Sequence, residues 1–245
     1  MKPSLPNYFY QSLAYSDAFT NDICFTNCPC CVFFSMSAME HIDFNIALDI
    51  ACRVGADSFT DLVGMLSTSK FFCSLAYNGT VLRQVSLKPF LDNSALINLS
   101  STFRPFFGLC LEAQNPTACY LKALRLACRE GCAEDGLALL LTIPSLSLHA
   151  QFATTLLEVC LGKYHDAMHI SAAFLEASSS FEAADAIATT VFHQMIQIGP
   201  RRIRSHCNTW HFEVYPSCPL TGCQMHNRCT DCLLYWYSVM FLVLC

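Results

Sequence analysis

The residues best suited to chemistry lie near the end of the chain, in the run CPLTGCQMHNRCTDC. Five potential metal ligands fall within these fifteen residues: Cys218, Cys223, His226, Cys229 and Cys232. Cysteine thiolates and histidine nitrogens are common ligands of tetrahedral zinc, and a C-x-x-C turn brings two thiolates to one ion. The sequence therefore predicts one structural zinc site with ligands drawn from these five residues. A metal-free, cysteine-rich end in a reducing compartment is the alternative.

Other histidines and cysteines form weaker patterns. His206, Cys207 and His211 could each replace a ligand of the predicted site. His165 and His169 are spaced by one helical turn, but the glutamate of an H-E-x-x-H motif is missing, so we interpret them as surface or groove histidines. The N-terminal run CFTNCPCC has no second ligand pair at zinc-finger distance, and a loosely packed lead is its simpler interpretation.

Motifs of catalysis are missing from the sequence. It contains no G-x-S-x-G, P-loop or paired-glycine dinucleotide turn. The C-x-x-C pair is not set in the strand–helix–strand pattern of thioredoxin-like proteins. A zinc site with four protein ligands is closed, whereas catalysis needs an open coordination position. The sequence therefore predicts a non-catalytic chain, and a zinc- or thiol-dependent enzyme is the least favoured hypothesis.

The composition limits the partners. The 245 residues are 53% hydrophobic and 13% charged, with a net charge of -5, which argues against nucleic-acid binding because phosphates require clustered Lys and Arg. The uncharged stretch 136–157 is interrupted by Pro144 and polar residues, and the apolar tail 233–245 is shorter than the roughly 20 residues of a membrane span. We expect no membrane span, two short helices in the first stretch, and core or partner packing of the tail. With no secretory signal and an odd number of cysteines (17), we expect reduced thiols and a cytoplasmic or nuclear location.

Local signals predict a first helix from Asp43. This residue can cap a helix in which Ile46, Ile50 and Val54 recur every four residues, with two alanines beside them. Gly55 stands where a left-handed C-terminal cap is expected.

Two further short helices and an extended segment follow. Ser58 begins the second helix, with Asp61 three positions later as in a capping box. Serines and a threonine then interrupt the chain before a third helix at 70–76. The segment VLRQVSL, residues 81–87, alternates apolar and polar residues and predicts a strand.

This region resembles an F-box, in particular that of plant F-box proteins in which the module precedes helical repeats and a cysteine-rich end. The matching residues are RVGADSFTDL (Arg53–Leu62), Ser69-Lys70, Phe72, Val81, VSL (Val85–Leu87) and Phe90. The family opens the module with Leu-Pro, whereas HIDFNIALDI has neither residue at that place.

The resemblance implies the substrate-receptor subunit of a Skp-cullin-F-box ubiquitin ligase, with a Skp-type adaptor and an unidentified target protein as partners. We expect the adaptor to contact apolar residues on successive helices: Ile46, Ile50, Leu62, Leu66 and Phe72. Because the Leu-Pro opening is missing, a diverged helical-repeat interaction module that no longer binds the adaptor is the alternative.

The middle of the chain predicts helical hairpins. Asn115-Pro116 begins a helix that ends at Gly131, and further helices are expected at about 133–142, 148–161 (with Gly162 as its stop), 164–177 and 181–198. Three residue pairs recur at a spacing of thirty-two, near the tetratricopeptide period: Tyr120 and Phe152, Leu124 and Leu156, Cys128 and Cys160. The resemblance likewise implies tetratricopeptide or Sel-like repeats here.

The sequence as a whole predicts a mostly α chain. A poorly patterned lead at 1–41 precedes an F-box-like module of three short helices at 42–90. An array of α-helical hairpin repeats at 91–199 and a small cysteine-rich, zinc-binding end at 200–245 complete the expected organisation. Such an array offers a concave surface that binds peptides or helices by shape.

Overall fold

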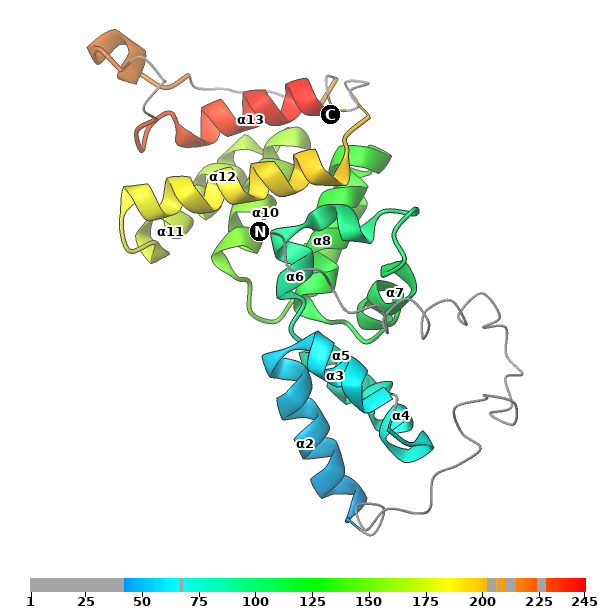
Figure 1. Ribbon diagram of the computed structural model, residues 1–245. Coiled ribbons are helices and arrows are strands. Elements are labelled where there is room, and N and C mark those ends of the chain that lie inside the picture. Colours follow the sequence, from blue (N-terminus) through cyan, green and yellow to red (C-terminus); the bar gives the residue numbers. More distant parts are fainter. Residues whose placement is uncertain (1–41, 67, 202–205, 207, 210–214, 224–227) are drawn as a thin grey trace, which may run out of the picture. The chain divides into compact units, whose positions relative to one another are not determined.

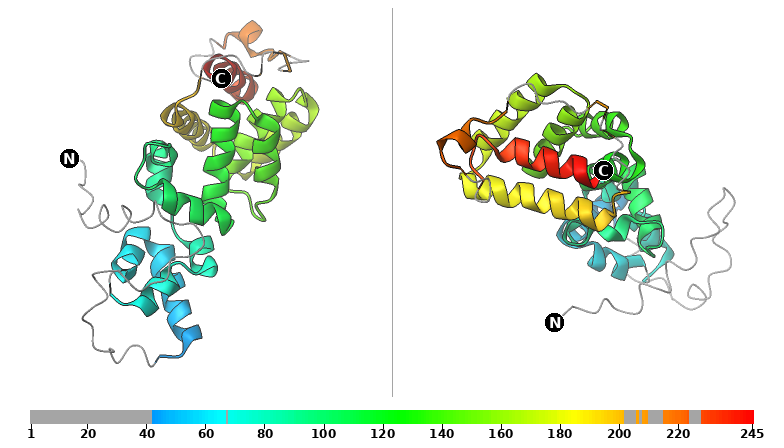
Figure 2. Two further views of the ribbon diagram at one scale, coloured as in Figure 1. Left: turned by 90° about the vertical axis from the view of Figure 1, so that its right-hand side faces the viewer. Right: turned by 90° about the horizontal axis from the view of Figure 1, so that it is seen from above.

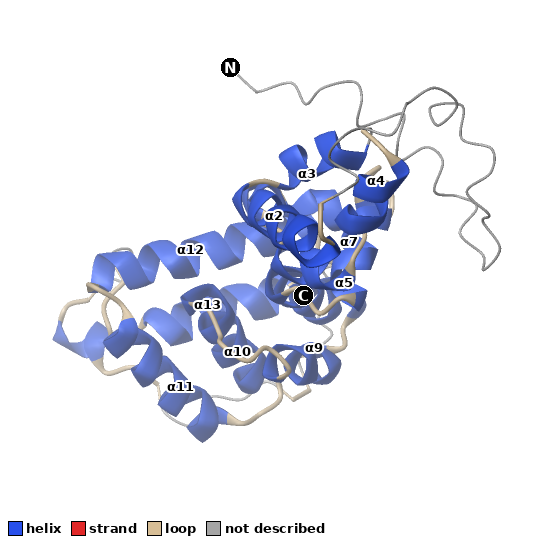
Figure 3. Cartoon of the chain, turned by 90° about the horizontal axis from the view of Figure 1, so that it is seen from below, coloured by secondary structure: helices blue, strands red, loops and turns tan. Residues whose placement is uncertain are grey.

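The computed structural model describes residues 42–245 except 67, 202–205, 207, 210–214 and 224–227. Every regular element in these residues is a helix (Figure 3), which confirms the predicted mostly α fold class. The described chain divides into two compact units: residues 42–90 with 96–118, and residues 91–95 with 119–245.

Short helices make up the first half of the described chain (Figure 1). Their bounds are α2 (Phe44–Asp57), α3 (Phe59–Leu66), α4 (Lys70–Ala76), α5 (Gly79–Gln84), α6 (Lys88–Asp92), η4 (Ser94–Ile97) and α7 (Arg104–Glu112). The predicted cap of α2 is confirmed, because Asp43 Oδ1 accepts a hydrogen bond from Asn45 N at 2.8 Å. Ser58 Oγ likewise accepts from Thr60 N at 3.2 Å at the start of α3.

The prediction that Gly55 ends the first helix is wrong. Helix α2 continues to Asp57, and Gly55 is buried inside it. A Cβ added at this glycine would lie 3.5 Å from Val81 Cγ1 and 3.7 Å from Leu62 Cδ2. The glycine therefore serves close packing of α2 on its neighbours and not a left-handed turn.

The predicted strand at 81–87 is also wrong. Residues 79–84 form α5, and the side-chain oxygen of Asn78 caps it by accepting from Thr80 N at 2.9 Å. Val81 and Val85 are both buried, and their spacing of four fits one helical turn as well as two strand alternations. The asparagine cap and burial against α2 favour the helix.

A cluster of phenylalanines forms the core of the first unit. Phe59 of α3 contacts the rings of Phe90, Phe103 and Phe106 at centroid distances of 5.7, 6.4 and 5.8 Å. All four side chains are buried. Aromatic side chains bury large apolar areas, so this cluster joins α3 to the segment around α7 within the unit.

Longer helices form the second unit. The remaining bounds are α8 (Pro116–Arg125), whose residues from Cys119 on belong to this unit, η5 (Leu126–Glu130), α9 (Ala133–Leu141), α10 (Leu148–Cys160), α11 (Tyr164–Ala177), α12 (Phe181–Ile198), η6 (Cys218–Thr221) and α13 (Leu233–Leu244). The helices predicted at 133–142, 148–161, 164–177 and 181–198 are confirmed. Gly131 and Gly162 are helix stops as predicted, and both adopt the left-handed conformation, with φ of 73° and 76°.

Helix α10 lies at the centre of this unit. It packs against α9, α11, α12 and α13, and every residue from Phe152 to Cys160 is buried. Phe152 contacts Phe174 of α11 and Tyr237 of α13 at ring distances of 5.3 and 5.4 Å. The apolar tail is therefore a core helix, α13, which lies beside α12 in Figures 1 and 2. None of the described helices is both long and apolar enough to cross a membrane.

The positions that recur at a spacing of thirty-two are equivalent in burial. Tyr120, Leu124 and Cys128 are buried in the first hairpin, and Phe152, Leu156 and Cys160 are buried in the second. Two helix–turn–helix elements therefore place the same register positions in the core, as repeats do.

Candidate functional site

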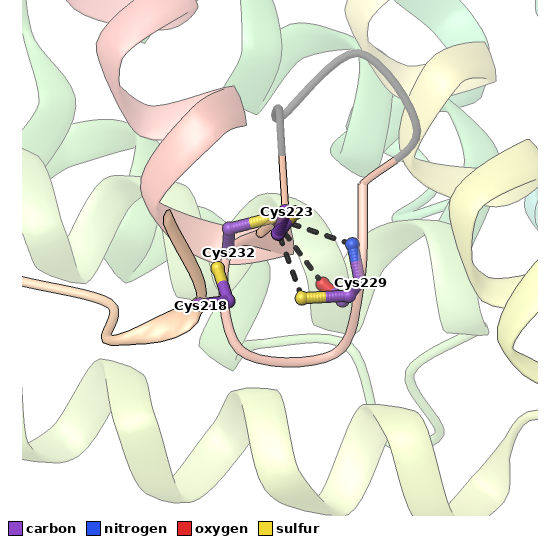
Figure 4. A group of neighbouring side chains, drawn as sticks. All are labelled: Cys218, Cys223, Cys229 and Cys232. Atoms are coloured by element: carbon purple, nitrogen blue, oxygen red, sulfur yellow. Dashed lines mark hydrogen bonds between the residues drawn. The ribbon is translucent and has the colours of Figure 1, made fainter. Parts of the chain in front are cut away.

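Four of the five predicted metal ligands converge at the start of α13 (Figure 4). The sulfur atoms of Cys218, Cys223, Cys229 and Cys232 all lie within 4.8 Å of one another. His226 lies outside the described residues. We call these four residues the four-cysteine cluster.

Local backbone structure positions the sulfurs. Cys218 opens the short helix η6, and the chain returns at Gly222, with φ 99°, to Cys223, whose N–H donates to Cys218 O at 3.0 Å. Cys229 and Cys232 form a turn in which Cys232 N donates to Cys229 O at 3.2 Å. The Cys229 N–H also donates to Cys232 Sγ at 3.3 Å. The two short loops thus direct their thiols to a common point.

The spacing of the sulfurs fits a tetrahedral metal. With metal–sulfur bonds of about 2.3 Å, the edge of a tetrahedron of sulfurs is about 3.8 Å. Cys232 Sγ lies 3.7 Å from Cys229 Sγ and 3.9 Å from Cys223 Sγ. A disulfide requires about 2.0 Å, and all four cysteines are free thiols. The cluster could hold one metal ion, in agreement with the coarser part of the zinc prediction.

The thiols differ in how readily they ionise. Burial raises the pKa of the Cys218 and Cys232 thiols above the ordinary value. Burial also acts to raise the pKa of Cys229, but hydrogen bonds to its sulfur, from the backbone of Cys232 and from Cys218, outweigh it and lower that pKa. Since metals bind thiolates, the lowered pKa of Cys229 makes it a readier ligand than Cys218 or Cys232.

The residues predicted to face an adaptor are divided between surface and core. Ile46 and Ile50 of α2 are 57% and 41% exposed, whereas Leu62 of α3 is 1% exposed and packs inside the first unit. Phe72 is half-buried, and its ring contacts Phe71 at 5.4 Å. The side chain of Leu66 lies outside the described part of the structure. Leu62 therefore stabilises the unit and is not available to a partner in this conformation.

The weaker candidate ligands do not add a second site. Among the described residues, three or more potential ligands come within reach of one ion only at the four-cysteine cluster. His165 and His169 are exposed on α11. His206 is buried, with Nε2 3.0 Å from Ala127 O and its ring stacked on Phe241. Cys207, His211 and the N-terminal cysteines lie outside the described residues.

Sequence reasoning missed one charged group beside the cluster. Arg228, which precedes Cys229, pairs with Asp185 of α12, forty-three positions earlier. No local pattern connects residues at that distance, so only the fold could reveal the pair. The sequence predicts a helix start at Asn115, but no local pattern predicts its contact with Val85 O at the end of α5.

Comparison with known proteins finds no counterpart of this chain: no family model, no curated protein and no solved structure matches it.

Proposed function

We propose that this protein is a non-catalytic binding subunit, the substrate receptor of a Skp-cullin-F-box ubiquitin ligase. In this proposal the helices of 42–90 dock on a Skp-type adaptor, and the helical hairpins of the second unit hold a target protein. The resemblance around Arg53–Leu62 supports it, and the observation that carries it is the exposed pair Ile46 and Ile50 on α2.

The packing of α2 explains why these side chains are exposed. Its buried side consists of Ala47, Ala51 and Gly55, spaced by four residues, and faces α3 and α5. Small residues let helices approach closely, and here they form the side of α2 that contacts its neighbours. The larger isoleucines lie on the adjacent side, outside this contact, and remain in solvent. Isoleucine is among the residues most often fully buried, and two of them one turn apart form a continuous apolar strip. A partner that covers this strip would remove it from water.

The expected effect of removing the strip is large. Burying an isoleucine side chain contributes about 1.5–3 kcal/mol, and about half of each side chain is still exposed, so the pair offers roughly 2 kcal/mol. Carboxylates at the same positions would add a desolvation cost on binding. We therefore expect an Ile46→Asp, Ile50→Asp variant to bind the adaptor on the order of 100-fold more weakly.

Calorimetric titration of the full chain with a purified Skp-type adaptor tests the proposal. The matched control is Asn45→Asp, Ala56→Asp, which adds the same charge to exposed positions on a different side of α2 from the isoleucines. Binding by the wild type and the control, with loss in the isoleucine variant, is the expected result. If all three chains bind equally, adaptor docking through α2 is excluded.

The second candidate function is a helical-repeat interaction module that has lost its adaptor. The missing Leu-Pro in HIDFNIALDI favours it, since those residues open the module in the family. The same titration distinguishes the two: no heat of binding from a chain with a native helical circular dichroism spectrum favours the free module.

We further propose that the four-cysteine cluster binds one structural Zn²⁺. Four sulfur ligands complete a tetrahedron and leave no open position, so the ion would support folding of the segment that leads into α13. Elemental analysis of the full chain should find one zinc per molecule, and a Cys229→Ser, Cys232→Ser variant should lose it. Cys132→Ser, which alters an exposed cysteine outside the cluster, is the control and should retain the ion. Absence of zinc from folded wild-type protein would exclude this site.

A further inference from the structure

Arg228 connects the four-cysteine cluster with α12. Its Nε lies 2.5 Å from Asp185 Oδ1, and its Nη2 lies 2.7 Å from Asp185 Oδ2. The two side chains are only 19% and 24% exposed. A bidentate, charge-assisted pair of this kind is directional, so the backbone at Arg228 is held in a defined position relative to α12.

The same guanidinium also contacts α13. Its central carbon lies 4.5 Å from the ring centre of Trp236 and 5.2 Å from that of Tyr237, within the range of cation–π attraction. The Tyr237 hydroxyl is 2.6 Å from Thr189 Oγ1 on α12. One arginine side chain therefore holds together the two helices that lie side by side in Figures 1 and 2.

Two of the four cysteines lie in the sequence between Arg228 and α13. Cys229 directly follows Arg228, and Cys232 directly precedes Leu233, the first residue of α13. A metal bound to both sulfurs would fix the turn between them. It would thereby fix the backbone from which the Arg228 side chain and α13 both extend.

We propose that metal binding at the four-cysteine cluster and packing of α13 against α12 form one coupled equilibrium, with Arg228 as the positioning residue that couples them. This inference rests on the proposed zinc site. Because coupling between two equilibria is reciprocal, zinc stabilises the docked α13, and the Arg228–Asp185 pair raises the affinity for zinc. Loss of the ion would loosen a helix whose buried side carries Leu234, Tyr237 and Phe241.

Zinc affinity of full-length variants tests one direction of the coupling. Competition with a chromogenic chelator should show about 10-fold weaker zinc binding by Arg228→Met and by Asp185→Asn, with no further loss in the double variant. The control is Arg125→Met, which removes the partly buried pair with Glu130 elsewhere in the same unit and should leave zinc affinity unchanged. Equal zinc affinity of all variants and the wild type would overturn the coupling.

Hydrogen exchange of the wild-type chain tests the other direction and needs no variant. Removal of zinc with a chelator should accelerate exchange of the α13 amides several-fold more than that of the α10 amides. If zinc binds but α13 exchange does not respond to it, the coupling is wrong while the zinc site stands. If zinc does not bind the wild type, the site and the coupling both fail.

Discussion

Asn115 provides the sharpest test of how the first unit is held together. This side chain is 2% exposed, and its Nδ2 amide donates to three carbonyl oxygens at 3.0, 3.1 and 2.9 Å, those of Leu82, Arg83 and Val85. Its Oδ1 accepts from the N–H groups of Thr117 and Ala118 at 3.0 and 3.2 Å. One residue therefore caps α8 and also satisfies the last carbonyls of α5.

Substitution by alanine removes both functions. Loss of an asparagine N-cap costs about 1 kcal/mol. The amide carries two hydrogens, and each net hydrogen bond contributes about 1 kcal/mol, so its loss adds about 2 kcal/mol. We expect Asn115→Ala to lower the free energy of unfolding by about 3 kcal/mol.

Asn78→Ala is the matched control, because the Asn78 side chain caps α5 in the same unit by accepting from Thr80 N. It should cost about 1 kcal/mol. Guanidinium unfolding followed by circular dichroism measures both values, and hydrogen exchange of residues 79–85 reports the local loss. If both variants lose the same stability, the amide contacts contribute nothing and the reasoning is refuted.

Three further perturbations have expected outcomes. A Cβ at Gly136 would lie 2.9 Å from Ala123 O, a backbone atom, so Gly136→Ala should lower the unfolding free energy by about 1–3 kcal/mol. A Cβ at Gly108 would meet nothing within 4 Å, so Gly108→Ala should raise the unfolding free energy by about 0.5–1 kcal/mol in the same denaturation assay. Burial acts to raise the pKa of Glu130, but hydrogen bonds from Arg125 and a lysine outweigh it and lower that pKa. The ionised Glu130 therefore contributes its full stabilisation above the carboxyl pKa of the unfolded chain, and this stabilisation is lost as the pH falls through the lowered pKa of the folded chain. Thermal melts below neutral pH should therefore show a shallower acid loss for Glu130→Gln than for the wild type, and equal losses would contradict the assignment. If the four-cysteine cluster binds the proposed zinc, a chelator should lower the melting temperature of the wild type but not that of the double serine variant, and an unchanged wild-type melt would argue against a structural ion.

Several elements followed from the sequence because their signals are local. Helix α12 has the predicted bounds, 181–198, and local signals set them, since Ser180 Oγ accepts from Ala183 N at its start and Gly199 adopts φ 82° after its end. The pairing of Cys229 with Cys232 was likewise predictable, because a C-x-x-C turn brings its own two sulfurs together regardless of the remaining fold.

Other features depended on contacts between distant residues. The repeat of Ile46 and Ile50 marked an amphipathic helix, but the alanines beside them are the residues that face the core. Spacing alone does not say which adjacent stripe a neighbouring helix will cover. Leu62 has the same apolar character as these isoleucines, yet it is buried inside the first unit next to Gly55 of α2.

The amino-acid sequence by itself predicted the bounds of α9, α10, α11 and α12, the spacing of the repeats and a set of candidate metal ligands that includes all four cysteines of the cluster. The helix bounds follow from caps and stops within a turn or two of chain, whereas the fold brings four of the candidate ligands together. Only the tertiary structure decided that residues 79–84 are helical, that Asn115 closes the end of α5, and that Arg228 meets Asp185. The physical reason is that burial and ion pairing depend on which surfaces meet, and those surfaces come from residues tens of positions apart.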